Sequence, residues 1–62
     1  MNIDEKQFIE LLKKSIDQNK KHFNEYCNIN NDLQAQYYLG KYRALISVLY
    51  LFDKKAAIEE GY

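Results

Sequence analysis

The side chains of this sequence with types suited to nucleophilic or metal chemistry are Cys27, His22 and Glu25. A cysteine nucleophile needs a base within hydrogen-bonding reach. His22 precedes Cys27 by five residues, which on a helix separates the two side chains by about 140°. His22 and Glu25 share a helical face, but the sequence has no second His or Cys to complete a set of zinc ligands. We therefore expect no enzymatic activity, no metal and no other cofactor, with Cys27 a small apolar residue and His22 a surface residue.

Phosphate binding by lysines is the second chemistry that the residue types allow. Two Lys-Lys doublets lie seven residues apart on the same side of a predicted helix: Lys13, Lys14, Lys20 and Lys21. Stripes of this kind bind nucleic-acid phosphates. Glu10 and Asp17 interrupt the stripe, each half of the chain has as many bases as acids, and Arg43 is the one arginine for reading base edges. We favour a solvated helix face and keep nucleic-acid binding as an alternative.

Length and composition exclude several classes of protein. The 62 residues, with 47% apolar side chains and nine bases against nine acids, indicate one small folded domain over residues 1–62. Cys27 has no partner for an intrachain disulfide, which excludes a disulfide-rich secreted scaffold. Two acids among the first six residues are unlike a signal peptide, and the longest apolar run, residues 44–52, is too short to span a bilayer. We expect a soluble cytoplasmic protein with no membrane partner.

The first half of the chain predicts one amphipathic helix over residues 4–27. Its apolar positions are spaced alternately by three and four residues, with Asn19 as the polar exception: Ile9, Leu12, Ile16, Phe23 and Tyr26. Asp4 and Gln7 have the spacing of a capping box, and Ile3 and Phe8 that of a hydrophobic staple. The helix start is therefore defined by two independent signals.

The second half predicts a turn followed by a longer helix. Residues 28–32, Asn-Ile-Asn-Asn-Asp, are the one cluster of turn-forming residues, and Asn31 with Gln34 forms a second capping box. The helix is expected to run from Asp32 to an end between Asp53 and Glu60, with Gly61 as its cap and a frayed last turn. Its core row is Ala35, Tyr38, Tyr42, Leu45, Leu49, Phe52 and Ala56.

Two long helices joined by a short turn form an antiparallel helical hairpin, so the predicted fold class is all-α. The residues expected in the core of this hairpin or of its dimer are Leu12, Ile16, Phe23, Tyr38, Tyr42, Leu45, Leu49 and Phe52.

The second helix has more apolar surface than the first can cover. Beside its core row it has a second row, Tyr37, Ala44, Val48 and Leu51, interrupted by Lys41, and a third, weaker row, Leu39, Ile46 and Tyr50. A helix that is apolar on most sides belongs inside a bundle. We predict that two hairpins pair into a homodimeric four-helix bundle with the second helix at its centre.

Gly40 in the middle of the second helix costs about 1 kcal/mol relative to alanine. Three explanations remain open: close approach of another backbone to the small residues Gly40, Ala44 and Ser47, a tolerated surface glycine, or a kink that divides the helix.

Tyrosine-rich surfaces are typical of protein interfaces, and four of the six tyrosines fall in the second helix. We expect a non-enzymatic protein–protein interaction module with these partner-binding residues: Tyr37, Lys41, Ala44, Val48, Tyr50 and Leu51. Nearly half of the residues have AT-rich codons, which is typical of many bacteria and their phages. The predicted role is therefore a phage or mobile-element inhibitor or regulator that binds a larger host protein. The alternatives are a small nucleic-acid-binding regulator and a structural subunit of a larger assembly.

Overall fold

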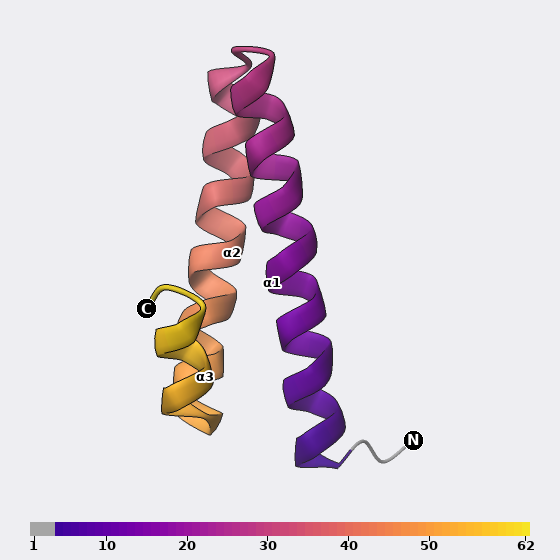
Figure 1. Ribbon diagram of the computed structural model, residues 1–62, viewed down its shortest axis with the longest axis vertical. Coiled ribbons are helices and arrows are strands. Elements are labelled where there is room, and N and C mark those ends of the chain that lie inside the picture. The colour runs from indigo at the N-terminus through magenta and orange to yellow at the C-terminus, as the bar shows by residue number, and fades with distance from the viewer. Residues whose placement is uncertain (1–3) are drawn as a thin grey trace.

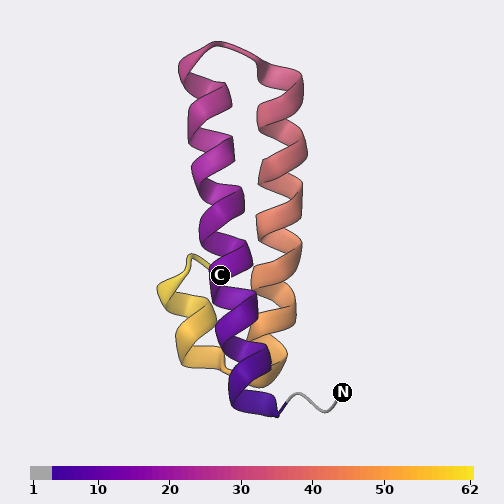
Figure 2. The same ribbon diagram turned by 90° about the vertical axis from the view of Figure 1, so that its right-hand side faces the viewer.

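The structure, a computed structural model, describes residues 4–62 as three helices. The helices are α1 (Glu5–Asn28), α2 (Asp32–Phe52) and α3 (Lys54–Glu59). The two long helices run antiparallel to each other, and α3 turns back beside the end of the hairpin that is remote from the turn (Figures 1 and 2). The prediction of an all-helical hairpin with two long helices is confirmed, and the chain adds a third, short helix.

Both predicted N-terminal caps of the long helices are present. The Asp4 carboxylate accepts a hydrogen bond from the backbone N–H of Gln7 at 2.8 Å. The Asn31 side chain accepts one from the backbone N–H of Gln34 at 3.3 Å. Each bond satisfies one of the N–H groups that the first turn of a helix leaves without a partner. The predicted staple involves Ile3, which lies outside the described residues.

Asn30 reverses the chain between α1 and α2. Its φ of 59° lies in the left-handed region, which asparagine tolerates better than most residues. The N–H of Asn31 donates to the carbonyl of Tyr26 at 2.9 Å, and the N–H of Asn30 donates to the carbonyl of Cys27 at 3.1 Å. This pair of bonds is a Schellman motif, which satisfies the last carbonyls of α1.

The second helix ends earlier than the sequence indicates. It continues through Gly40, so the alternative of a kink there is wrong, and it ends at Phe52, before the expected range. Asp53 adopts an extended conformation, with φ −150° and ψ 91°, and its carboxylate accepts a hydrogen bond from the N–H of Ala56 at 3.1 Å. The break therefore occurs where an aspartate can cap a new helix.

Gly61 caps α3. Its φ is 111°, and the N–H of Tyr62 donates to the carbonyl of Ala57 at 3.0 Å, which repeats the Schellman arrangement of the first turn. The predicted glycine cap is confirmed, although it closes a separate short helix. The fraying of the last turn stays a prediction, and the contact of Lys20 of α1 with Glu60 acts against it.

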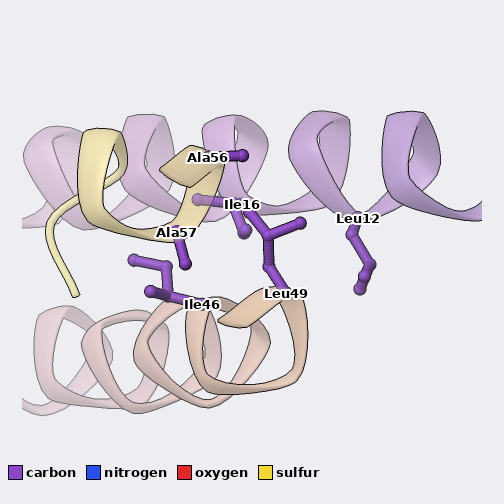
Figure 3. Close-up of a cluster of buried hydrophobic side chains, with 6 residues drawn as sticks. All are labelled: Leu12, Ile16, Ile46, Leu49, Ala56 and Ala57. Carbon is purple, nitrogen blue, oxygen red and sulfur yellow. The ribbon is translucent and has the colours of Figure 1, made fainter. Parts of the chain in front are cut away.

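The core lies where all three helices meet (Figure 3). Its buried members are Leu12 and Ile16 from α1, Ile46 and Leu49 from α2, and Ala56 and Ala57 from α3. The two alanines keep the buried side of α3 small, which allows this helix to lie close to the hairpin. Asn19, the polar exception in the first helix, is buried, and its amide donates to the carbonyl of Ser15 at 2.7 Å.

Leu12 and Leu11 give a matched test of this core, because they are neighbours on α1 with 7% and 51% of their surface exposed. Leu12→Ala leaves a cavity and is expected to lower the free energy of unfolding by about 2–3 kcal/mol. Leu11→Ala is expected to change it by less than about 0.5 kcal/mol. Urea unfolding followed by circular dichroism measures both, and equal losses for the two variants would contradict this core.

Candidate functional site

Two sides of α2 are covered by the rest of the chain. The core row faces α1, as the edge-to-face contact of Tyr42 with Phe23 shows, with ring centroids 5.8 Å apart. The third row faces α3 and the C-terminal residues, because Ile46 is buried in the core with Ala57 and Tyr50 stacks on Tyr62 at 4.1 Å. The prediction that a second hairpin covers the apolar surplus of α2 is therefore not needed for Ile46 and Tyr50, which are covered within one copy.

A third side of α2 is not covered within the described chain. Its residues, which we call the outer face, are Leu33, Tyr37, Gly40, Ala44, Ser47, Val48 and Leu51. Gly40 and Ala44 are each two residues from Tyr42, so at about 100° per residue they lie on the side opposite α1. The exposed fractions of the large side chains are 83% for Leu33, 56% for Tyr37, 37% for Val48 and 80% for Leu51. An apolar strip of this kind marks an interaction surface more often than a solvated one.

Five of the six predicted partner-binding residues lie on this face or at its edge and are exposed: Tyr37, Lys41, Ala44, Val48 and Leu51. The Lys41 ammonium lies 5.1 Å from the ring centroid of Tyr37 and 5.5 Å from that of Tyr38, so it is held at the edge of the strip. Tyr50 is separate from the other five, half-buried against Tyr62.

Leu33 belongs to the outer face but is missing from the sequence-based set. The signal was available, because Leu33 precedes Tyr37 by four residues and Leu51 by five helical turns.

The residues predicted for the core or dimer differ in burial. Leu12, Ile16 and Leu49 are buried in the monomer. Four are half-buried: Phe23, Tyr38, Tyr42 and Leu45. Phe52 is exposed over 45% of its surface, and its ring meets that of Phe8 edge to face at 5.1 Å.

An aromatic cluster surrounds Tyr38 near the turn. Tyr38 stacks on Tyr26 of α1 with ring centroids 5.5 Å apart, and Tyr37 meets it edge to face at 5.0 Å. The His22 ring is 4.9 Å from Tyr38, and its Nδ1 is 3.9 Å from the Glu25 carboxylate. The cluster joins the two long helices and limits the positions that Tyr37 can adopt at the edge of the outer face.

The lysine stripe of the alternative nucleic-acid interpretation is divided. The Lys20 ammonium donates to the backbone carbonyl of Glu60 at 2.7 Å and lies 3.1 Å from its carboxylate. Lys13 is half-buried, and Lys14 and Lys21 are exposed. Lys20 therefore holds the C-terminal turn against α1, and the Glu60 carboxylate neutralises one of the four lysines of the stripe.

The other candidate groups stay dispersed over residues 4–62. Cys27 is an exposed free thiol. Within this part of the chain no three His, Cys, Asp or Glu side chains gather as metal ligands would. Among the described helices, none combines the length and the apolar character that crossing a bilayer requires.

The chain matches no protein-family model, and searches of curated proteins and of solved structures find none similar to it.

Lys20 and Lys21 give a matched test of the C-terminal contact. The Lys20–Glu60 side chains are 33% and 21% exposed, so the pair is partly screened, and we expect Lys20→Ala to cost about 0.5–1 kcal/mol. The loss is local, so the amides of Glu60, Gly61 and Tyr62 should exchange about two- to fivefold faster. Exchange in the exposed Lys21→Ala variant should match the parent. Equal protection in both variants would show that the contact does not hold α3.

Proposed function

We propose that this protein is a non-enzymatic protein–protein interaction module that works as a homodimer, with the outer face of α2 as the surface between the two copies. The observation that carries the proposal is the exposure of Leu33, Tyr37 and Leu51 on one side of a helix whose other sides are already packed. Removing such side chains from water is the main driving force of association.

The small size of the core supports the same proposal. Among the described residues, the buried cluster has six members, and two of them are alanines. The Cα positions extend over 39 × 26 × 13 Å, so the molecule is thin in one direction and its apolar side chains have little depth in which to be buried. Many small natural proteins add a disulfide, a metal or oligomerisation to a core of this size. A lone cysteine supplies no internal disulfide, and a second copy adds buried apolar area directly.

The role that we favour for the dimer is inhibition or regulation of a larger host protein, in the manner of proteins encoded by phages and mobile elements. Its support is compositional: nearly half of the residues have AT-rich codons, and the chain is small, uncharged overall and helical. The Lys20–Glu60 pair weighs against the nucleic-acid alternative, because it removes one of four phosphate-binding charges.

The outer face is tested by comparing Leu51→Lys with Leu11→Lys. Both leucines are exposed, but Leu51 lies on the outer face and Leu11 on α1. At about 100 micromolar, the parent and Leu11→Lys are expected to sediment with twice the 7.4 kDa chain mass, and Leu51→Lys as a monomer.

Circular dichroism provides the control for folding in this comparison, because all three proteins should retain the same helicity. A parent chain that stays monomeric and fully helical at this concentration would refute the proposal. Equal dimerisation of the two variants would place the interface elsewhere.

A further inference from the structure

The outer face has the spacing of a helix–helix seam. Six of its seven residues, which we call the seam, advance by four, three, four, three and four residues, with Val48 beside them: Leu33, Tyr37, Gly40, Ala44, Ser47 and Leu51. This is the heptad period with which two helices interlock side chains along their length. Both ends of the seam have strongly exposed leucines, and its middle has small residues.

We propose, building on the homodimer above, that two copies bind through this seam in antiparallel orientation, with a two-fold axis at the level of Tyr42. Residues at equal distances before and after position 42 then face each other across the interface. Gly40 meets Ala44 of the second copy, Tyr37 meets Ser47, and Leu33 meets Leu51.

Side-chain volume favours this orientation over a parallel one. In the antiparallel pair each Tyr37 ring faces a small serine, and glycine faces alanine at the centre, where the two backbones approach most closely. In a parallel pair the two Tyr37 rings would face each other, one helical turn from Gly40. Their bulk would hold the two helices apart next to Gly40 and Ala44, whose small size permits close approach. Close packing requires such matching of large with small side chains.

The monomer leaves room for a second helix at the centre of the seam. Among the described residues, no heavy atom outside the helix's own backbone and its chain neighbours lies within 4 Å of a Cβ built on Gly40. α1 lies on the side of α2 opposite Gly40, and Ile46, which packs with Ala57 of α3, is on a different row. Nothing within the described chain therefore requires a glycine at position 40, and the backbone of the second copy would supply the close approach that does.

The area fits a reversible dimer. A buried aliphatic side chain contributes about 100 Å² and an aromatic one about 200 Å², so the exposed parts of Leu33, Tyr37, Val48 and Leu51 amount to about 300 Å² per copy. The small seam residues and the stems of the flanking polar side chains bring the area to about 500 Å² per copy. That is about a tenth of the 4838 Å² surface of the chain, the usual share for a small protein in a complex. The total of about 1,000 Å² lies at the lower limit for a specific interface.

Positive charges beside the seam make the affinity of dimerisation depend on the salt concentration. Residues 33–52 contain no acid, and Lys41 and Arg43 lie on opposite edges of the outer face. The two-fold axis brings each of them near its counterpart in the second copy, so like charges meet across solvent at both edges. Because salt screens this repulsion, dimerisation should strengthen as salt rises. A foreign helix with acidic edges would instead bind less tightly at high salt.

Cysteine cross-linking tests the orientation. In a Cys27→Ser background, Leu33→Cys and Leu51→Cys chains, one of them tagged, are mixed in a glutathione redox buffer and their disulfides are quantified. The two positions are 18 residues, about 27 Å, apart along α2, whereas a disulfide needs Cα atoms within about 7 Å. The antiparallel seam therefore predicts mixed disulfides in about tenfold excess over either homodimer.

Gly40→Leu provides a second readout, because it has opposite effects on the monomer and on the dimer. The side chain enters open space in the monomer and improves helix propensity, so the fold should gain stability. At the centre of the seam it should weaken dimerisation at least about tenfold.

The cross-linking and the Gly40→Leu variant test the antiparallel orientation, whereas the oligomeric state of the parent chain tests the homodimer itself. Homodimeric disulfides of Leu51→Cys, or a statistical mixture, would overturn the antiparallel orientation while leaving the dimer in place. Gly40→Leu chains that dimerise as tightly as the parent would remove the seam centre from the interface. A parent chain that remains monomeric would overturn both proposals.

Discussion

The apolar circumference of α2 is the constraint on which the rest of this structure depends. No single neighbour can cover a helix with apolar residues on three sides, because one helix contact buries only one stripe. α1 covers the row that contains Tyr42 and Leu49, and α3 covers Ile46. The third side, from Leu33 to Leu51, is exposed in the monomer. Burial of the apolar residues of α2 therefore links the fold to the proposed function. Two sides of α2 are covered within the chain, and we propose that another copy covers the third.

The hairpin could be predicted because its determinants are local. Asp4 and Asn31 cap their helices through neighbouring backbone groups, and Asn30 adopts the left-handed conformation that its side chain tolerates. The third helix could not be predicted in the same way. Asp53 is a helix-capping residue inside a run without glycine or proline, so the apolar spacing continues smoothly from Leu49 through Phe52 to Ala56. A second helix is favoured over one long helix by the free energy gained when Ala56 and Ala57 pack on Ile46. The spacing of apolar residues alone does not reveal this packing.

The same limit applies to the candidate site. Spacing placed Tyr37, Val48 and Leu51 on one side of α2, because residues on a helix face recur with a fixed period. The spacing of apolar residues does not predict that Tyr50 stacks on Tyr62 or that Lys20 binds Glu60. Both contacts depend on the direction in which the chain turns after Phe52. The sequence therefore predicts Tyr50 to be a partner-binding residue, although Tyr62 covers it within one copy.

The position of the outer face determines the shape of the proposed dimer. Gly40 and Ala44 lie opposite the side of α2 that meets α1, so pairing through them would set the four long helices in a row, with the two α2 helices inside, rather than in a square bundle. The charged sides of both α1 helices would then face outwards, and the two turns would lie at opposite ends. The surfaces left for a larger partner would include the α1 faces, where basic and acidic side chains alternate, the aromatic cluster around Tyr38, and the exposed Ile58 of α3. Dimerisation through α2 and recognition of a larger protein would therefore share Tyr37 but otherwise use different residues, and a substitution away from Tyr37 could disturb one without the other.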